Sequence, residues 1–169
     1  VALKKCLEID PNFLAAYTGL GTTYYSLKKY DSAIENFSKY IELSTDEKQN
    51  KKIQKYVGLS YTQLGQSAKS NKNYDKAIAN LNEAVKNYNY DAAYLTLAEI
   101  YVELAKYDDA IAAADNVIKY RTSKSKISKG APHYYKGLAY KGLDDKVKAK
   151  ESFKQSVKDR QYKANSQYE

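Results

Sequence analysis

The chain has 169 residues, of which 43% are hydrophobic and 28% are charged, and this composition excludes a disordered chain. Its single cysteine, Cys6, excludes an intrachain disulfide and a cysteine-based metal cluster, and no apolar run approaches the ~20 residues that span a bilayer. The net charge of +8 comes from residues 121–169, which hold 13 basic and 5 acidic residues, whereas residues 1–120 hold 15 of each.

The first segment, residues 1–13, has an amphipathic helical pattern that Pro11 closes. Because the first residues read as the middle of an amphipathic helix, we expect the chain to be part of a longer protein. Both the cytoplasm and the periplasm stay open as its location. Lys, Asn and Tyr are abundant along the whole chain, which is typical of an AT-rich genome, and we expect a bacterial source.

Two short phrases then recur along the chain. One combines Tyr, Asp, any residue, Ala and Ile, and its copies are KYDSAIENF (29–37), NYDKAIANL (73–81) and KYDDAIAAA (106–114). The other places a small residue, then Tyr three residues later, then Leu three residues after that. Its copies are LGTTYYSL (20–27), VGLSYTQL (57–64), LAEIYVEL (97–104) and KGLAYKGL (136–143). Spacings of three and four put these side chains on one helical face, so the repeated unit is expected to be a helix, a turn and a second helix.

The shared residues indicate how each hairpin is built. Asp31, Asp75 and Asp108 fall at the start of the second helix, where we expect them to cap free N–H groups and to suit the helix dipole. The small residue of the first helix and the Ala of the second let the two helices approach closely. One hairpin cannot bury its apolar stripe alone, so the copies must stack and share a core.

This pattern resembles the tetratricopeptide repeat (TPR), a helical hairpin of about 34 residues. The first complete copy matches through Tyr17, Leu20, Gly21, Tyr24, Tyr30, Ala33 and Phe37, and the third through Tyr94, Leu97, Ala98, Tyr101, Tyr107 and Ala110. The resemblance implies an all-α superhelix of antiparallel hairpins in a single array. Its expected segments are the second helix of a preceding repeat (1–13), repeats at 14–47, 48–90 and 91–124, a degenerate repeat (125–160) and a capping or truncated helix (161–169).

The second copy, which holds seven extra residues and a longer first helix, allows two registers. If Gly58 is the small residue, the extra residues (roughly 66–72) lengthen the first helix after Leu64 by two turns, and its buried face stays in phase. If Tyr61, Leu64 and Gly65 form the signature, the extra residues belong to the preceding linker. We favour the Gly58 register, because it keeps the same triplet in all four copies.

No group of residues in the sequence has a catalytic pattern. His133 is the only histidine and falls where this repeat packs an aromatic ring, which favours a structural role. Cys6 falls at a small-residue position and is expected to be a buried thiol. Neither a dinucleotide-binding glycine motif nor a phosphate-binding loop is present. We therefore expect no enzymatic activity, no cofactor and no metal.

By the same resemblance, the first helices of the repeats are expected to line a concave groove. The groove positions combine apolar, aromatic and polar side chains. They are Thr18, Thr22, Tyr25, Lys52, Lys55, Leu59, Thr62, Leu95, Glu99, Val102, Tyr134, Leu138 and Lys141. Such a groove suits a peptide anchored by apolar side chains, with charges at the rim setting its orientation. The expected function is a protein–protein interaction scaffold with a protein or peptide ligand.

One TPR subclass clamps the terminal carboxylates of chaperones through Lys, Asn and Arg at five groove positions. In the better of two frames these positions hold Lys55, Leu59, Thr96, Ala131 and Tyr135, and only the lysine fits. The sequence therefore argues against this clamp.

Two alternatives to groove binding stay open. The basic C-terminal portion suggests docking on a polyanion, either nucleic acid or a membrane surface. Dedicated nucleic-acid surfaces favour arginine, however, and here lysine supplies 26 of the 28 basic residues, so nucleic acid is disfavoured as a partner. A membrane is disfavoured as well. The other alternative is self-association of the array, because uncapped end repeats expose apolar surface.

Overall fold

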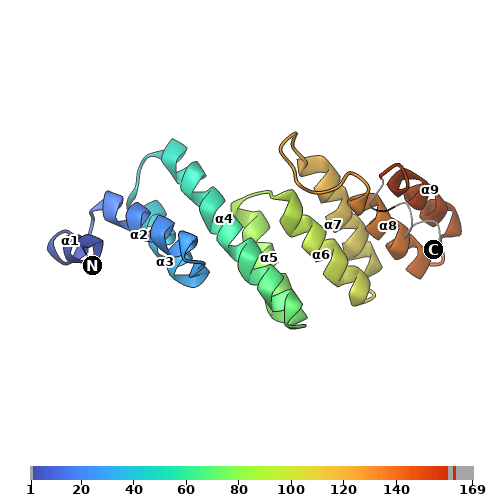
Figure 1. Cartoon of the computed structure of the whole chain (residues 1–169), viewed down its shortest axis with the longest axis horizontal. Coiled ribbons are helices and arrows are strands. Elements are labelled where there is room, and N and C mark those ends of the chain that lie inside the picture. Colours follow the sequence, from blue (N-terminus) through green and yellow to red (C-terminus); the bar gives the residue numbers. More distant parts are fainter. Residues whose placement is uncertain (1, 160–161, 163–169) are drawn as a thin grey trace.

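The computed structural model describes residues 2–159 and 162, and this part of the chain contains nine α-helices and no strand, which confirms the all-α fold. The helices are α1 (Ala2–Ile9), α2 (Leu14–Ser26), α3 (Tyr30–Leu43), α4 (Glu47–Ser70), α5 (Tyr74–Asn87), α6 (Asp91–Glu103), α7 (Tyr107–Tyr120), α8 (Ala131–Gly142) and α9 (Lys146–Ser156). They follow one another along an elongated array, with α1 at one end and α9 at the other (Figure 1).

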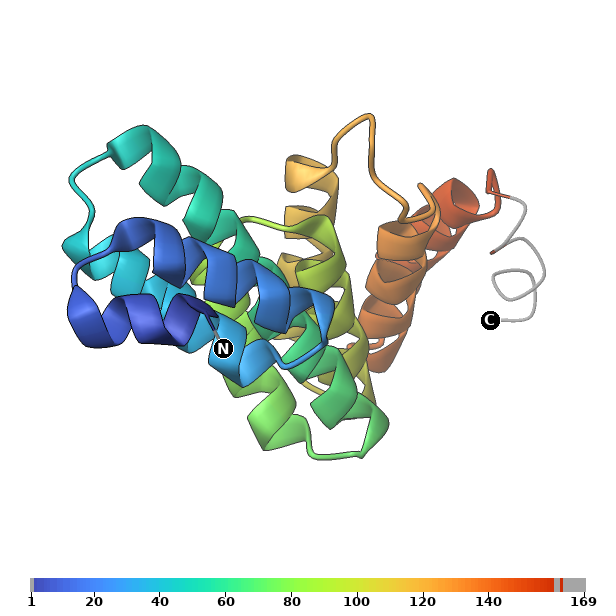
Figure 2. The ribbon, with the colours of Figure 1, turned by 60° about the vertical axis from the view of Figure 1, so that its left-hand side comes forward.

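The helices after α1 pair into four hairpins, α2 with α3, α4 with α5, α6 with α7 and α8 with α9. The second helix of each hairpin packs against the first helix of the next, as Figures 1 and 2 show for α5 and α6. In addition, α4 contacts α6 and α6 contacts α8, so these first helices meet on one side of the array. The chain is therefore a stack of helical hairpins that each bury their apolar face against a neighbour.

The start of each second helix differs from expectation in one detail. Asp31, Asp75 and Asp108 lie inside the first helical turn, so the capping role expected for them is wrong. In two of the second helices, the capping side chain belongs to the residue just before the helix. Asn73 accepts a hydrogen bond from the N–H of Lys76 at 3.1 Å, and Asp145 accepts one from the N–H of Lys148 at 3.0 Å. The three aspartates still carry negative charge at a helix N-terminus, which suits the dipole.

The turn inside each hairpin uses one backbone conformation. It is set by a residue with φ between 56 and 58°, and these residues are Lys28, Lys72, Ala105 and Asp144. In the third hairpin, the N–H of Lys106 then donates to the carbonyl of Tyr101 at 2.8 Å, which satisfies a carbonyl at the helix end. Glycine is usual at this left-handed position, so each of these side chains carries a conformational cost.

The packing of Gly65 corrects the expected register of the second hairpin. The helix α4 has 24 residues against 13 in α2, so a first helix is indeed longer here. A Cβ on Gly65, however, would lie 2.6 Å from Cγ of Leu81, just as a Cβ on Gly21 would lie 2.5 Å from the ring of Phe37. Gly65 therefore takes the small-residue position that we assigned to Gly58, and the added turns lie at the N-terminal end of α4.

The core runs along the array as a series of clusters. Ala33, Ala77 and Ala110, at matching positions of three second helices, are all 0% exposed. Large side chains close the same interfaces, with Phe37 at 1% and Leu81 at 0% exposure. The hairpins thus share buried surface with their neighbours, as repeat stacking requires.

Candidate functional site on the first helices

A polar network joins three of the first helices. The ammonium group of Lys69 on α4 pairs with the carboxylate of Glu99 on α6. The hydroxyl of Tyr135 on α8 donates to the same carboxylate at 3.0 Å. Beside them, the amide of Gln66 donates to the hydroxyl of Thr96 at 3.4 Å. One carboxylate on the central hairpin therefore binds side chains from both neighbouring hairpins.

The network is shielded from solvent. The side chains of Lys69 and Glu99 are only 24% and 22% exposed, so salt screens their attraction less than it screens an exposed pair. Burial raises the pKa of the Tyr135 hydroxyl, and the nearby Glu99 carboxylate raises it further because it would repel a phenolate. The site thus presents charges of both signs, with Tyr135 held in its neutral form.

A hollow of about 280 Å³ borders this network. Its walls come from α4, α6 and the loop before α8. It is lined by Gln66, Lys69, Ser70, Ala92, Leu95, Thr96, Glu99 and Ile127. A hollow with an apolar wall and a few polar groups can hold one side chain of a ligand and fix its orientation.

Tyr162 lies on the same face, further toward the C-terminal end. Its ring centroid is 5.3 Å from that of Tyr134, and the ring packs against the cluster that includes Leu95 and Ala131. Burial raises the pKa of its hydroxyl, and the Glu99 carboxylate adds to this effect. An aromatic side chain from outside the four hairpins is therefore accommodated on the first helices.

Of the groove positions on α2, the two threonines bond within their own helix. Thr18 donates to the carbonyl of Ala15 at 3.0 Å, and Thr22 donates to the carbonyl of Thr18. Tyr25 instead meets the rings of Tyr30 and Tyr56 edge-on, with centroids 5.7 Å away in each case. Hence α2 contributes an aromatic contact to the second hairpin and only weak polar groups to a ligand.

The register shift changes the groove positions on α4. Thr62 is 0% exposed and donates its hydroxyl to the carbonyl of Gly58 at 2.8 Å, so its assignment as a ligand contact is wrong. Lys52 and Lys55 are exposed, but they lie on the added turns, before the groove positions begin. Leu59 is half-buried and starts the groove positions in the corrected register. The shift also moves Lys55 out of the one chaperone-clamp position that it matched.

On α6 and α8 the groove positions differ in accessibility. Leu95 is only 9% exposed, whereas Val102 and Leu138 are half-buried and retain contact surface. Lys141 is exposed at the end of α8, and Tyr134 is held between neighbouring rings. The accessible apolar surface of these two helices therefore lies mainly at Val102 and Leu138.

Four members of the polar network were missed from the sequence: Gln66, Lys69, Thr96 and Tyr135. The Gly65 register would have supplied two of them, because it aligns Gln66 with Thr22 and Lys69 with Tyr25. The other two lie one residue after a groove position on their helices. A side chain beside the mapped stripe still reaches a neighbouring helix when the helices touch.

Two single residues of chemical interest differ in environment. Cys6 is partly exposed, contrary to the buried thiol expected from its position. His133 is half-buried; burial and, to a smaller extent, Lys136 lower the pKa of its imidazole. Among the described residues no three His, Cys, Asp or Glu side chains gather in a way that could hold a metal ion.

The family models of known proteins match two parts of the chain. Models described as "Tetratricopeptide repeat" match residues 2–35 and 62–125. Together with the stacked hairpins and their close glycine contacts, these matches decide the family. The chain belongs to the tetratricopeptide-repeat proteins.

Solved TPR structures share this fold. The structure of MamA is 25% identical in sequence and superposes with a TM-score of 0.56, covering 97% of this chain and 82% of that one. YrrB, described as "a TPR protein with an unusual peptide-binding site", is 20% identical with a TM-score of 0.54, covering 92% of this chain and 73% of that one.

A curated relative matches over a short segment. Hsp70-Hsp90 organizing protein 2 of Arabidopsis thaliana is 41% identical over 39 residues, which make up 23% of this TPR chain. The match spans 7% of the length of that relative.

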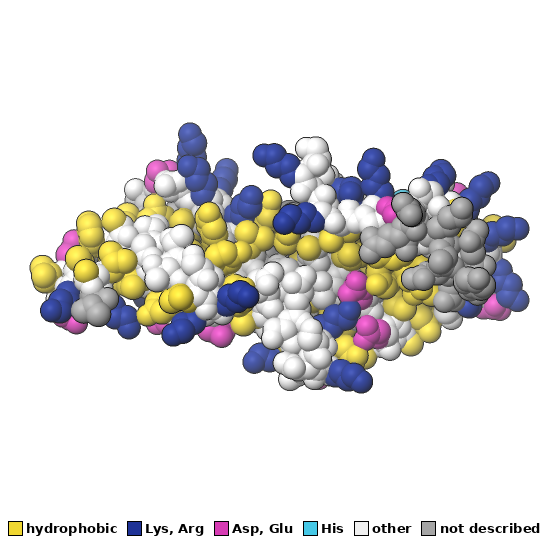
Figure 3. Space-filling model, in the orientation of Figure 1, with side chains coloured by type: hydrophobic (Ala, Val, Ile, Leu, Met, Phe, Trp, Pro, Cys, Tyr) yellow, Lys and Arg dark blue, Asp and Glu magenta, His cyan; other side chains and the backbone are white. Residues whose placement is uncertain are grey.

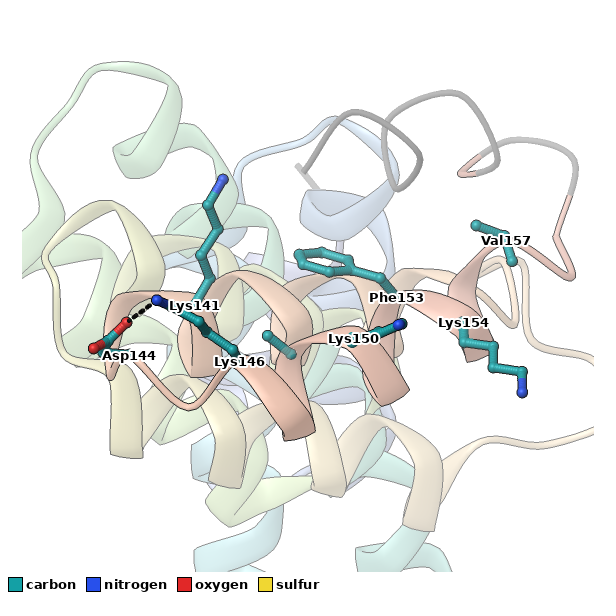
Figure 4. Close-up of a pocket in the computed structure, with 8 residues that line it drawn as sticks. Lys141, Asp144, Lys146, Lys150, Phe153, Lys154 and Val157 are labelled. Carbon is teal, nitrogen blue, oxygen red and sulfur yellow. Dashed lines mark ion pairs between the residues drawn. The ribbon is translucent and has the colours of Figure 1, made fainter.

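The C-terminal end of the TPR array carries a second, larger hollow of about 680 Å³ on α8 and α9 (Figure 4). Its floor is apolar, from Ala149, Phe153 and Val157, and four lysines stand around it. Lys146 pairs with Asp144 at 3.7 Å. None of the helices that the structure describes is both long and apolar enough to cross a membrane.

Proposed function

We propose that this TPR array is a non-enzymatic interaction scaffold that binds a peptide or a partner domain in the groove formed by α2, α4, α6 and α8. The family favours protein binding, and the peptide-binding site in the description of YrrB supports the choice of a peptide. The groove offers half-buried apolar residues, Val102 and Leu138, beside the polar network around Glu99. Apolar anchors next to a few fixed polar groups are what peptide recognition requires.

The observation that carries the proposal is the position of Tyr162. This side chain comes from beyond the last hairpin and packs against Tyr134 and against the cluster that includes Leu95. An aromatic ring of a ligand would find the same surroundings: neighbouring rings, an apolar wall and the Glu99 carboxylate within reach. We therefore expect the preferred ligands to carry an aromatic residue.

Selection from a library of random linear peptides tests this function. Peptides selected on the whole chain are then measured against Val102→Glu/Leu138→Glu, which places charge in the groove. The matched control is Ile118→Glu/Val147→Glu, because these residues are 42% and 79% exposed and the change in net charge is the same. Circular dichroism checks that both variants remain folded.

We expect the selected peptides to be rich in aromatic residues and to bind the groove variant at least about tenfold more weakly, a loss of about 1.4 kcal/mol. The control variant should bind within about twofold of the parent chain. Peptides that bind both variants equally well would contradict a groove site.

A second candidate function is favoured by the lysines of α9. Lys146, Lys150 and Lys154 recur at intervals of four residues and therefore lie on one face of the helix. This stripe would dock the C-terminal hairpin on a polyanion. Its affinity would fall steeply as the salt concentration rises, because the counterions that binding releases gain less entropy in concentrated salt. Measuring the binding of the chain to duplex DNA and to anionic vesicles over a salt series tests it, and affinity that is flat with salt rejects it.

A further inference from the structure

The chain departs from its own repeat in two places, and both lie at the same edge of the array. One is the N-terminal extension of α4, and the other is the long loop 121–130 between α7 and α8. Both stand at the upper edge in Figure 1. Between them lies a cleft of about 580 Å³, whose base includes the link between α5 and α6. Its volume falls within the range of about 300–1,000 Å³ typical of binding sites.

The two segments that flank this edge cleft are rich in basic residues, of which Lys55, Lys124 and Lys126 line it. The segments 47–57 and 121–130 together hold eight basic residues and one acidic residue, Glu47. The basic residues are Lys48, Lys51, Lys52, Lys55, Arg121, Lys124, Lys126 and Lys129. Figure 3 shows Lys and Arg side chains gathered along this edge. In the part of the chain that the structure describes, no ion pair links any of the eight to an acidic side chain.

The loop wall is tied to the rest of the fold by a buried carboxylate. Asp91, at the start of α6, is 6% exposed and accepts the hydroxyl hydrogen of Ser125. Its other oxygen accepts the N–H of Ala92 at 2.9 Å, and Ser125 in turn accepts the N–H of Ile127 at 3.1 Å. These hydrogen bonds hold the loop at the cleft before a ligand binds. The loop therefore loses less conformational freedom on binding, which favours affinity.

Tyrosines line the cleft between the lysines. The rings of Tyr88 and Tyr90 stack on each other at 6.0 Å, and Tyr120 stacks on Tyr94 at 5.5 Å. The ammonium of Lys55 lies 5.2 Å from the ring centre of Tyr88. Because these rings are already partnered, they offer less free face for stacking nucleic-acid bases. Their apolar edges and hydroxyl donors can instead receive apolar side chains and carboxylates.

We infer that the edge cleft between α4 and the loop 121–130 binds an acidic segment of a partner protein, one that carries apolar side chains among its carboxylates. The lysines match the charge of such a segment, and the tyrosines match its apolar side chains. An acidic stretch of this chain, residues 99–115, is folded into α6 and α7, so we assign the segment to a partner protein and not to a second copy. This site adjoins the groove on the first helices and shares Leu59 with it, but its lysines and tyrosines lie outside the groove, so it does not depend on a ligand there.

Fluorescence anisotropy of the whole chain with a labelled probe tests the inference. The probe is a short peptide of glutamates interspersed with Leu and Phe. A peptide with Gln in place of Glu and an oligothymidylate of equal length serve as comparisons. The cleft variant is Lys124→Glu/Lys126→Glu, both exposed loop residues. The matched control is Lys4→Glu/Lys5→Glu on α1, where both residues are exposed and the change in net charge is the same.

We expect the acidic peptide to bind the parent chain and to bind the cleft variant about tenfold more weakly, equivalent to about 1.4 kcal/mol. The control variant should bind it within about twofold of the parent, and the Gln peptide should bind weakly throughout. Equal losses in both variants, no measurable binding of the acidic peptide, or tighter binding of oligothymidylate would each overturn the inference. The groove variant Val102→Glu/Leu138→Glu should leave this binding intact, which separates the two sites.

Discussion

The hydroxyl of Tyr135 donates a 3.0 Å hydrogen bond to Glu99, a residue 36 positions earlier and on a different hairpin. Since the same carboxylate also pairs with Lys69, it joins α4, α6 and α8. Replacing Tyr135 with Phe is expected to lower the free energy of unfolding by about 1 kcal/mol at neutral pH, the usual net value of such a bond. Urea denaturation measures it. Tyr74→Phe, which removes an exposed bond to Glu103, should cost less.

The stability of the chain should also depend on the state of Tyr135 at alkaline pH. Its pKa is raised above the ordinary value of 10.0 in the folded chain, so the unfolded chain releases this proton first. The stabilisation is therefore fully present below about pH 10 and declines as pH rises, by at most about 1.4 kcal/mol per pH unit. Above pH 10 the gap in unfolding free energy between the parent and Tyr135→Phe should narrow. A constant gap would contradict the raised pKa.

Gly65→Ala tests the close packing of α4 on α5 in the second hairpin. The added Cβ would lie 2.6 Å from Cγ of Leu81, inside a packed interface, so we expect a loss of about 1–3 kcal/mol in unfolding free energy. Gly19→Ala is the matched control, because its Cβ would meet only the flexible end of Leu3, at 2.8 Å. Because alanine favours a helix more than glycine does, the unfolding free energy of the control should stay unchanged or rise slightly. If both variants lose equally, helix packing at Gly65 is not the cause.

Ala105→Gly should stabilise the chain, although glycine usually weakens helical proteins. Ala105 has φ of 56° in the turn after α6, a conformation that glycine adopts without a steric penalty. After allowing for the more flexible unfolded chain, we expect a gain of about 0.5–1 kcal/mol. The same substitution at Ala112, exposed within α7, should instead cost about 1 kcal/mol. Thermal denaturation should show a higher melting temperature for Ala105→Gly and a lower one for Ala112→Gly than for the parent chain.

Removing the ring of Tyr162 should strengthen peptide binding in the groove. This ring packs against Tyr134 and against the cluster that includes Leu95, so a ligand that uses this surface must displace it. Tyr162→Ala is therefore expected to bind a selected peptide about tenfold more tightly, because more of the protein is competent to bind. Ile118→Ala on α7 should leave the affinity unchanged. Weaker binding by Tyr162→Ala would show that the ring is part of the site and not a competitor.

The repeated phrases were sufficient to predict the all-α array, because a helical period and a repeated small residue depend only on local spacing. The register of α4 was not predictable in the same way. Gly58 and Gly65 are seven residues apart and therefore lie on nearly the same helical face, so either could meet the next helix. Only the position of Leu81 on α5 distinguishes them, and that is a contact between helices.

The candidate site was predicted only in outline for a related reason. Glu99 was assigned to the groove from its position in the repeat, but its partners Lys69 and Tyr135 depend on the distances between α4, α6 and α8. The edge cleft was even harder to predict from the sequence. The loop 121–130 has no repeat counterpart, and the bond from Ser125 to Asp91 that holds it joins residues 34 positions apart.

The contacts between the helices also divide the array into parts of unequal cooperativity. Helix α1 has no buried residue and reaches the rest of the array chiefly through α2, whereas all four hairpins stack on their neighbours and the last three also share direct contacts between first helices. In a repeat protein, the coupling between neighbours decides which units open together. Helices α2 to α9 should therefore exchange their amide hydrogens more slowly, while α1 opens separately and earlier. Binding across the groove would then protect the hairpins together and leave α1 almost as dynamic as before.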